Sequence, residues 1–109
     1  MEELLDQAYE QFVVNHLGLP WEEWFQNPRW IIPVKHAEAT YESPIKGGIN
    51  CQIEICINSI SNSSFVLNTS FLQEQPCCSV QTVHVTCCRE TKRKIEIPPS
   101  IKMVLVSKL

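Results

Sequence analysis

Three histidines and six cysteines are the side chains of this sequence best suited to acid–base or nucleophilic chemistry. His84 and Cys88 lie in a stretch typical of a strand, where they share a face but are separated by about 13 Å. That separation is too large for a nucleophile and its base to share a hydrogen bond within the strand. A pair formed across two strands stays open. Otherwise we interpret each histidine (His16, His36 and His84) as a structural or surface residue.

Four of the cysteines form two adjacent pairs, Cys77-Cys78 and Cys87-Cys88. Neither pair has the spacing of a zinc-binding motif, so the sequence predicts no metal site. Both pairs are typical of small hydrophobic residues in buried strands, and a cross-strand disulfide or redox pair is the alternative. The sequence has no glycine-rich phosphate loop, no His-Glu-x-x-His and no Gly-x-Ser-x-Gly motif. We therefore predict no cofactor.

The acidic residues Glu2, Glu3 and Glu10 could serve as general bases only if they were buried beside a pocket. Their spacing follows the polar face of a predicted helix, where carboxylates are usually solvated. The sequence therefore offers no carboxylate whose position alone marks it as catalytic.

The element that must position these groups is an amphipathic helix predicted over residues 1–17. Apolar residues recur at spacings of three and four, the pattern of a helix that buries one face; they include Leu5, Ala8 and Phe12. Gly18 can end the helix in a left-handed conformation. We expect the apolar face of this helix to pack against a sheet.

The rest of the chain is typical of strands. A short helix or ordered loop is predicted at residues 19–27, and strands are predicted at 30–42, 49–60, 65–71 and 77–88, with a short fifth piece at 95–97. Residues 101–109 have no clear assignment. One helix packed on an antiparallel meander of at least four strands is an α+β domain of two layers, which spans residues 1–109.

Two groups of side chains have two interpretations each. The aromatic rings at residues 21, 24 and 25 either pack in the core or line an apolar pocket. The polar residues His36, Glu38 and Thr40 alternate along the middle of a predicted strand. This set is typical either of a face that meets another subunit or a ligand, or of an ordinary solvated face.

The charge pattern narrows the range of partners. The net charge is −3, and the one basic cluster, residues 89–94, is interrupted by Glu90. Without a basic stripe to neutralise phosphates, nucleic acid is not expected as a partner. No apolar run approaches the ~20 residues that span a bilayer, and the acidic N-terminus does not resemble a signal peptide. We therefore expect no membrane partner and a cytoplasmic protein with reduced cysteines.

Several stretches resemble a known family. Residues 6–12 are similar to the central helix of the hotdog-fold acyl-CoA thioesterases of the 4-hydroxybenzoyl-CoA thioesterase family. Residues 36–48 are similar to the second strand of that family and its following turn, and residues 62–66 to the next hairpin. Residues 82–92, with the prolines at 98 and 99, are similar to its last long strand and exit. In detail the sequence most resembles the cyanobacterial 1,4-dihydroxy-2-naphthoyl-CoA hydrolases of phylloquinone synthesis.

The resemblance implies a hotdog fold, a homodimer or tetramer, and hydrolysis of an aromatic acyl-CoA. It also implies CoA bound at a subunit interface, and the candidate phosphate contacts, chosen by charge and location, are Lys46, Arg89, Arg93 and Lys94. In the family an Asp-x-Asp-x-x-Gly loop before the central helix carries the catalytic aspartate. This sequence contains no such loop and is N-terminally short relative to the family. No residue inherits the catalytic role, and we expect little or no hydrolysis.

Two other functions stay open. A hotdog dimer could bind an acyl-CoA, or serve as a structural unit, without hydrolysing it. A helix followed by an antiparallel meander also describes cystatin-like folds, and residues 81–85 are similar to the cystatin Gln-x-Val-x-Gly stretch. Val85 stands where that stretch has glycine, within a long predicted strand, which argues against a cystatin loop.

Overall fold

The computed structural model describes the backbone of residues 2–109 and the side chains of residues 4–109. Met1, predicted as the first residue of the long helix, lies outside the described residues. The elements in chain order are α1 (Glu2–Gln11), η1 (Phe12–His16), α2 (Trp21–Phe25), β1 (Trp30–Ile31), β2 (Val34–Tyr41), β3 (Gln52–Ile60), β4 (Ser64–Leu72), β5 (Pro76–Val85), β6 (Cys87–Cys88) and α3 (Pro99–Ser107). None of the described helices is long and apolar enough to cross a membrane.

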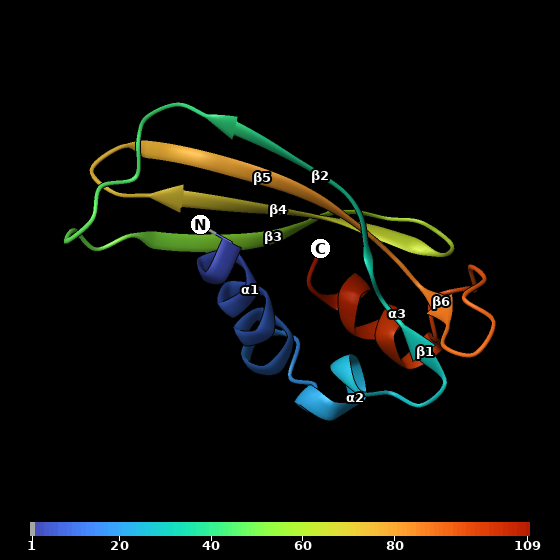
Figure 1. Ribbon diagram of the computed structural model, residues 1–109. Coiled ribbons are helices and arrows are strands. Elements are labelled where there is room, and N and C mark those ends of the chain that lie inside the picture. The colour runs from blue at the N-terminus through green and yellow to red at the C-terminus, as the bar shows by residue number, and fades with distance from the viewer. Residues whose placement is uncertain (1) are drawn as a thin grey trace.

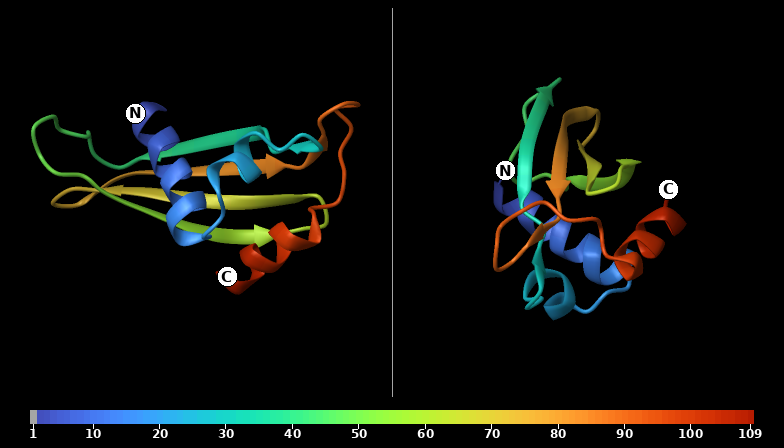
Figure 2. Two further views of the ribbon diagram at one scale, coloured as in Figure 1. Left: turned by 90° about the horizontal axis from the view of Figure 1, so that it is seen from below. Right: turned by 90° about the vertical axis from the view of Figure 1, so that its right-hand side faces the viewer.

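Four antiparallel strands form the main sheet in the order β2-β5-β4-β3, and the sheet curves around α1 (Figures 1 and 2). Strands β3 to β5 form the predicted meander. The prediction was wrong for β2, which pairs with β5 at the far edge and not with its sequence neighbour β3. Because α1 and α3 cover the same face of the sheet, the domain has the predicted two-layer α+β arrangement.

The predicted N-terminal helix is confirmed, with one change in its last turn. After α1 the helix widens into the π-helical turn η1, in which the Leu17 amide donates to the Phe12 carbonyl at 3.0 Å. Gly18 then takes a φ of +72°, the left-handed conformation predicted for the helix end. Phe12 is buried, and the half-buried Leu5 packs against the cluster of buried side chains around Phe71.

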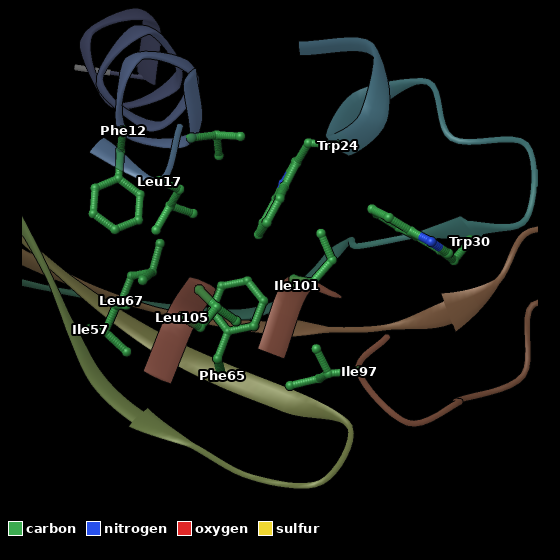
Figure 3. Packing of buried hydrophobic residues seen from close by; sticks show 11 residues of the cluster. Phe12, Leu17, Trp24, Trp30, Ile57, Phe65, Leu67, Ile97, Ile101 and Leu105 are labelled. Atoms are coloured by element: carbon green, nitrogen blue, oxygen red, sulfur yellow. The ribbon is translucent and has the colours of Figure 1, made fainter. Parts of the chain in front are cut away.

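Side chains from almost every element meet in the core between the helices and the sheet (Figure 3). Strand β4 contributes most clearly, because its alternate residues Phe65, Leu67, Thr69 and Phe71 are all at most 2% exposed. This confirms the alternation predicted for that strand. Trp24 is buried in the same core, so at least this ring of the aromatic group at residues 21–25 is a core residue.

Three predicted strand boundaries were wrong. The strand predicted at 30–42 is divided at Pro33, whose missing N–H prevents a continuous ladder, into β1 and β2. The strand predicted at 77–88 is divided at Thr86 into β5 and β6, and β6 pairs with β1 in a separate small sheet. Residues 95–97 form no strand, and the unassigned tail forms helix α3, which buries Ile101 and Leu105.

Candidate functional site

The structure has a cavity between α1 and the inner face of the sheet, which we call the seam cavity. Its lining residues come from five elements: Leu5, Asp6 and Tyr9 on α1, Val34 on β2, Ile55 on β3, Leu67 and Thr69 on β4, and Thr82 and His84 on β5. The cavity measures about 50 Å³. Because pockets that hold drug-sized ligands measure roughly 300–1,000 Å³, an aromatic acyl group must displace some of the lining side chains to enter.

His84 is a deeply buried polar residue of the seam cavity. Its ring stacks between Phe65 and Tyr9, with centroid distances of 4.9 Å on both sides. Its Nε2 shares a 2.8 Å hydrogen bond with Thr82 Oγ1, and its Nδ1 has no hydrogen-bond partner among the described residues. Burial lowers the pKa of His84 to about 4, so the imidazole is neutral at pH 7.

Tyr9 connects the seam cavity to the aromatic core. Its hydroxyl accepts a 2.7 Å hydrogen bond from Trp24 Nε1, and its ring also meets Phe25 edge-on. Burial raises the pKa of the Tyr9 phenol, an effect only partly offset by the bond from Trp24. Tyr9 and His84 are therefore both uncharged near neutral pH, and they form a polar wall rather than an acid–base pair.

Of the predicted acid–base candidates whose side chains are described, only His84 lines the seam cavity. Cys88 lies on β6, beyond the break at Thr86, and the ring of His84 is enclosed by aromatic side chains rather than by a cysteine. His36 is exposed and lies 3.3 Å from Glu38 on the same strand. His16 is exposed on η1, and Glu10 is exposed on α1. The side chains of Glu2 and Glu3 lie outside the described residues.

Sequence reasoning did not identify Asp6 as a candidate site residue. Asp6 is exposed on α1, yet it is the one carboxylate that lines the seam cavity among the described residues. Its signal was the spacing of three residues to Tyr9, which places the two side chains next to each other on α1. That spacing only becomes informative once the sheet face opposite the helix is known.

A second, larger groove runs between α1 and the edge strand β3. It measures about 430 Å³ and is partly open to solvent. Its floor is apolar, with Phe12, Ile53 and Ile55, and its helical wall is polar, with Gln7, Gln11, Asn15 and His16 among its residues. The described residues that line the groove include no carboxylate, lysine or arginine, and His16 is the one titratable side chain among them.

The cysteines fit the interpretation as small hydrophobic residues only in part. Cys77 and Cys78 are buried on β5, as predicted, whereas Cys87 and Cys88 are half-buried on β6 and Cys56 is exposed. None of the six cysteines forms a disulfide, which contradicts the cross-strand disulfide alternative. Backbone and hydroxyl donors of Thr91, followed by the Glu90 amide, lower the pKa of Cys88.

The four candidate phosphate contacts lie in two separate places. Lys46 lies in the loop between β2 and β3, at one end of the sheet, where its backbone is held by the Gln73 side chain. Arg89, Arg93 and Lys94 lie in the turn after β6, at the opposite end (Figure 1). Arg89 Nε donates a 2.6 Å hydrogen bond to the Asn27 carbonyl, so part of its guanidinium is already engaged. Within one chain these cations do not converge on one ligand.

Strand β2 borders the seam cavity and is exposed along its whole length. Its inner-face residues Ala37 and Ala39 pair with positions Thr82 and Val80 of β5, which are buried. The helical cover therefore ends between β5 and β2. The free edge of β2 exposes backbone groups beside the cavity, as does any edge strand that lacks a neighbour.

Comparison with known proteins shows which proteins this chain resembles. The sequence profile of the thioesterase-like superfamily matches residues 2–105. A 1,4-dihydroxy-2-naphthoyl-CoA hydrolase from Microcystis aeruginosa is 27% identical over 97 residues, which cover 88% of this chain and 70% of the relative.

Solved structures share the fold at lower identity. A 1,4-dihydroxy-2-naphthoyl-CoA thioesterase from Synechocystis superposes with a TM-score of 0.81 at 17% identity, covering 97% of this chain and 81% of the other. A Staphylococcus aureus protein solved in complex with CoA superposes with a TM-score of 0.85 at 16% identity, covering 98% and 68%. These likenesses confirm the predicted hotdog-type α+β fold. Because the superfamily profile spans nearly the whole chain, the protein belongs to the thioesterase-like superfamily.

Proposed function

We propose that this protein is an acyl-CoA thioesterase-type domain that takes an aromatic acyl-CoA, such as 1,4-dihydroxy-2-naphthoyl-CoA. The observation that carries the proposal is the seam cavity, which is lined by the stacked rings of Tyr9 and His84 beneath α1, with Phe65 stacked on His84 behind it. Aromatic walls favour flat aromatic guests, since ring pairs add energy beyond the area that they bury. The Microcystis relative supports the same class of substrate.

Thioester hydrolysis needs a carboxylate to attack the carbonyl or activate water, together with N–H donors for the developing oxyanion. Tyr9 and His84 are held uncharged by burial, so that among the described residues Asp6 is the carboxylate available as a base at the seam cavity. The family's aspartate loop has no counterpart in this sequence. Loss of one oxyanion donor alone costs ~10²–10³ in rate. We therefore expect the 109-residue chain to bind aromatic acyl-CoA more effectively than it hydrolyses it.

We also propose that the protein forms a homodimer through β2. The eight residues of this strand are all exposed, including Tyr41 at 65% and Val34 at 52%. An isologous contact along the edge would pair its backbone and cover these side chains. An antiparallel contact would bring the end of the sheet that carries Lys46 in one copy towards the end that carries Arg89, Arg93 and Lys94 in the other. This arrangement supports binding of CoA phosphates near the interface by cations from both copies.

Hydrolysis can be measured directly by the loss of absorbance of the thioester bond. This assay is preferred to a thiol reagent, because such a reagent would also react with exposed cysteines such as Cys56. We expect binding of aromatic acyl-CoA thioesters in preference to acetyl-CoA by calorimetry, with slow turnover that Asp6→Asn abolishes. Glu10→Gln is the matched control, because Glu10 is exposed on α1 and does not line the seam cavity. Equal affinity for acetyl-CoA and aromatic thioesters would refute the substrate class.

The second candidate function is a hotdog dimer that binds acyl-CoA without catalysis. It is favoured by the same pKa shifts, which remove Tyr9 and His84 as proton carriers. This function would be supported if the protein binds acyl-CoA tightly, shows no turnover above the uncatalysed rate, and keeps the same affinity in Asp6→Asn. Turnover that falls with Asp6→Asn while binding is retained would select the enzyme.

A further inference from the structure

The lining of the seam cavity is graded from exposed to buried. Where α1 faces β2, the lining residues Asp6 and Val34 are exposed. The lining residues that are at most 6% exposed are Leu67, Thr69, Thr82 and His84. A guest that enters between α1 and β2 therefore meets these four residues last, and His84 is the one titratable side chain among them.

The imidazole of His84 is held on three sides. Its two faces are covered by Tyr9 and Phe65, each at a centroid distance of 4.9 Å, and its Nε2 lies 2.8 Å from Thr82 Oγ1. A guest can therefore approach only the edge of the ring, where Nδ1 is the nitrogen that remains. Nδ1 is buried and has no hydrogen-bond partner among the described residues. Because buried polar atoms are nearly always paired, an unpaired one on a residue that lines a cavity points to a ligand.

A second buried atom is unpaired but lies elsewhere. Thr86 Oγ1 has no partner among the described residues either, yet Thr86 is fully buried and does not line the seam cavity. An unpaired atom enclosed in the core only costs stability. His84 differs, because the space of the cavity lies beside it and can admit a partner.

We propose that His84 Nδ1 pairs with a hydroxyl group on the aromatic ring of the acyl group, and that His84 thereby selects hydroxylated rings over bare ones. This inference rests on the function proposed above and names a residue that sets its substrate preference. The Thr82 hydroxyl can donate to Nε2 or accept from it, so Nδ1 can be an acceptor or a donor. A hydroxyl group pairs with Nδ1 in both cases, because it also donates and accepts.

The neutral state of the imidazole narrows the guest group further. Burial lowers the pKa of His84 to about 4, so the ring carries no positive charge at pH 7. A carboxylate or phosphate beside it would lose its hydration without gaining an opposite charge. The group that pairs with His84 is therefore polar and uncharged, which excludes the phosphates of CoA from this end of the cavity.

The position of His84 also sets the direction of the guest. When the hydroxylated ring lies at the buried end, the thioester at the other end of the acyl group lies nearer the exposed end, where Asp6 lines the cavity. The bond to be hydrolysed is then on the side of the carboxylate. His84 acts in this arrangement as a specificity residue and takes no part in proton transfer.

Calorimetry of the full chain with benzoyl-CoA, 3-hydroxybenzoyl-CoA and 4-hydroxybenzoyl-CoA tests the assignment. We expect the wild type to bind at least one hydroxylated thioester about tenfold more tightly than benzoyl-CoA, the effect of one net hydrogen bond. His84→Phe should bind all three equally. His16→Phe is the matched control and should keep the preference, because His16 is exposed and does not line the seam cavity. Equal binding by the wild type, or an unchanged preference in His84→Phe, would overturn the proposal.

Nitrogen NMR of the wild type gives a readout that does not depend on the folding of a variant. The Nδ1 resonance of His84, assigned through the backbone, should shift when the preferred hydroxybenzoyl-CoA is added and stay near its free position with benzoyl-CoA. Equal shifts with both thioesters would refute the hydrogen bond. The proposed function is judged separately by benzoyl-CoA against acetyl-CoA. A preference for benzoyl-CoA without any effect of the hydroxyl group would retain the aromatic substrate and refute the role of His84 alone.

Discussion

Strands β4 and β2 belong to the same sheet but have opposite surroundings. On β4 the inner-face residues Phe65, Leu67 and Phe71 are at most 1% exposed, whereas all eight residues of β2 are exposed. The difference does not come from the strand geometry, since both strands pair with β5 in regular ladders over most of their length. It comes from position, because β4 lies between β5 and β3 beneath the helices, whereas β2 is an edge strand beyond the helical cover (Figure 1). Burial in this fold is therefore decided by what lies over and beside a strand as well as by its own pattern.

The covered part of the sheet should respond most strongly to truncation. Phe65→Ala removes a ring that is 1% exposed and packs on Trp24 and His84, so we expect the free energy of unfolding to fall by about 3–5 kcal/mol. The matched truncation on β2, Tyr41→Ala, should cost less than about 1 kcal/mol when the protein is dilute enough to be monomeric. Urea unfolding followed by tryptophan fluorescence measures both, and equal losses would refute the distinction between the two strands.

The buried imidazole should make the covered region sensitive to acid. Folding lowers the pKa of His84 from about 6.5 to about 4, so the unfolded chain takes up the proton first as the pH falls. The contribution of His84 is complete above about pH 6.5 and is lost as the pH falls towards 4, by about 3 kcal/mol in total.

The measurement is the difference between the stability–pH curves of the wild type and of His84→Gln. This difference should change by about 3 kcal/mol between pH 7.5 and 4. His36→Gln, which alters an exposed histidine on β2, is the matched control and should change stability by less than about 1 kcal/mol. Parallel curves for the wild type and His84→Gln would show that the imidazole is protonated equally in both states.

Two buried threonines near the end of β5 allow a hydrogen-bonded hydroxyl to be compared with one that has no partner among the described residues. Thr82→Val removes the partner of His84 Nε2 and should cost about 1–3 kcal/mol, because a buried polar atom loses its hydrogen bond. Thr86 is fully buried, and its Oγ1 has no partner among the described residues, so Thr86→Val should be neutral or stabilising. Thermal unfolding of the two variants decides, and a larger loss for Thr86→Val than for Thr82→Val would contradict this assignment.

The smallest effect is expected on the outer face of β2. His36 and Glu38 lie 3.3 Å apart, with their side chains 59% and 71% exposed. Exposed ion pairs of this kind contribute about 0.2–1 kcal/mol. Glu38→Gln should therefore change the unfolding free energy of the monomer by less than about 1 kcal/mol. A loss above 2 kcal/mol in dilute protein would mean that β2 is covered even in a single chain.

The contrast between the strands also explains what could be predicted from the sequence. The helix at residues 2–16 and the alternation of β4 follow from local periodicity, and both were predicted correctly. The pairing of β2 with β5 joins residues far apart in the chain, and nothing in either strand specifies its partner. Helix α3 was missed because its β-branched residues are as typical of a strand as of a helix, and only packing of Ile101 and Leu105 distinguishes the two.

The candidate site was less predictable than the fold for the same reason. His84 and Asp6 are isolated polar residues in the sequence and become neighbours of one cavity only when α1 lies across β5. The four candidate cations were chosen by charge, and the length of the sheet separates Lys46 from the others. The break at Pro33, by contrast, could have been predicted from the sequence, because a proline has no N–H to donate to the ladder.

The π-helical turn η1 has a consequence for how the length of this helix can vary. In η1 the chain needs five residues to return from Phe12 to Leu17, where an α-helix needs four, and both residues are buried. The turn therefore holds one residue more than a regular helix would need to connect the same two buried positions. Deletion of Asn15, which is exposed, would convert η1 into an α-helical turn and leave both anchors facing the core. The loss of one residue should therefore be tolerated at this turn.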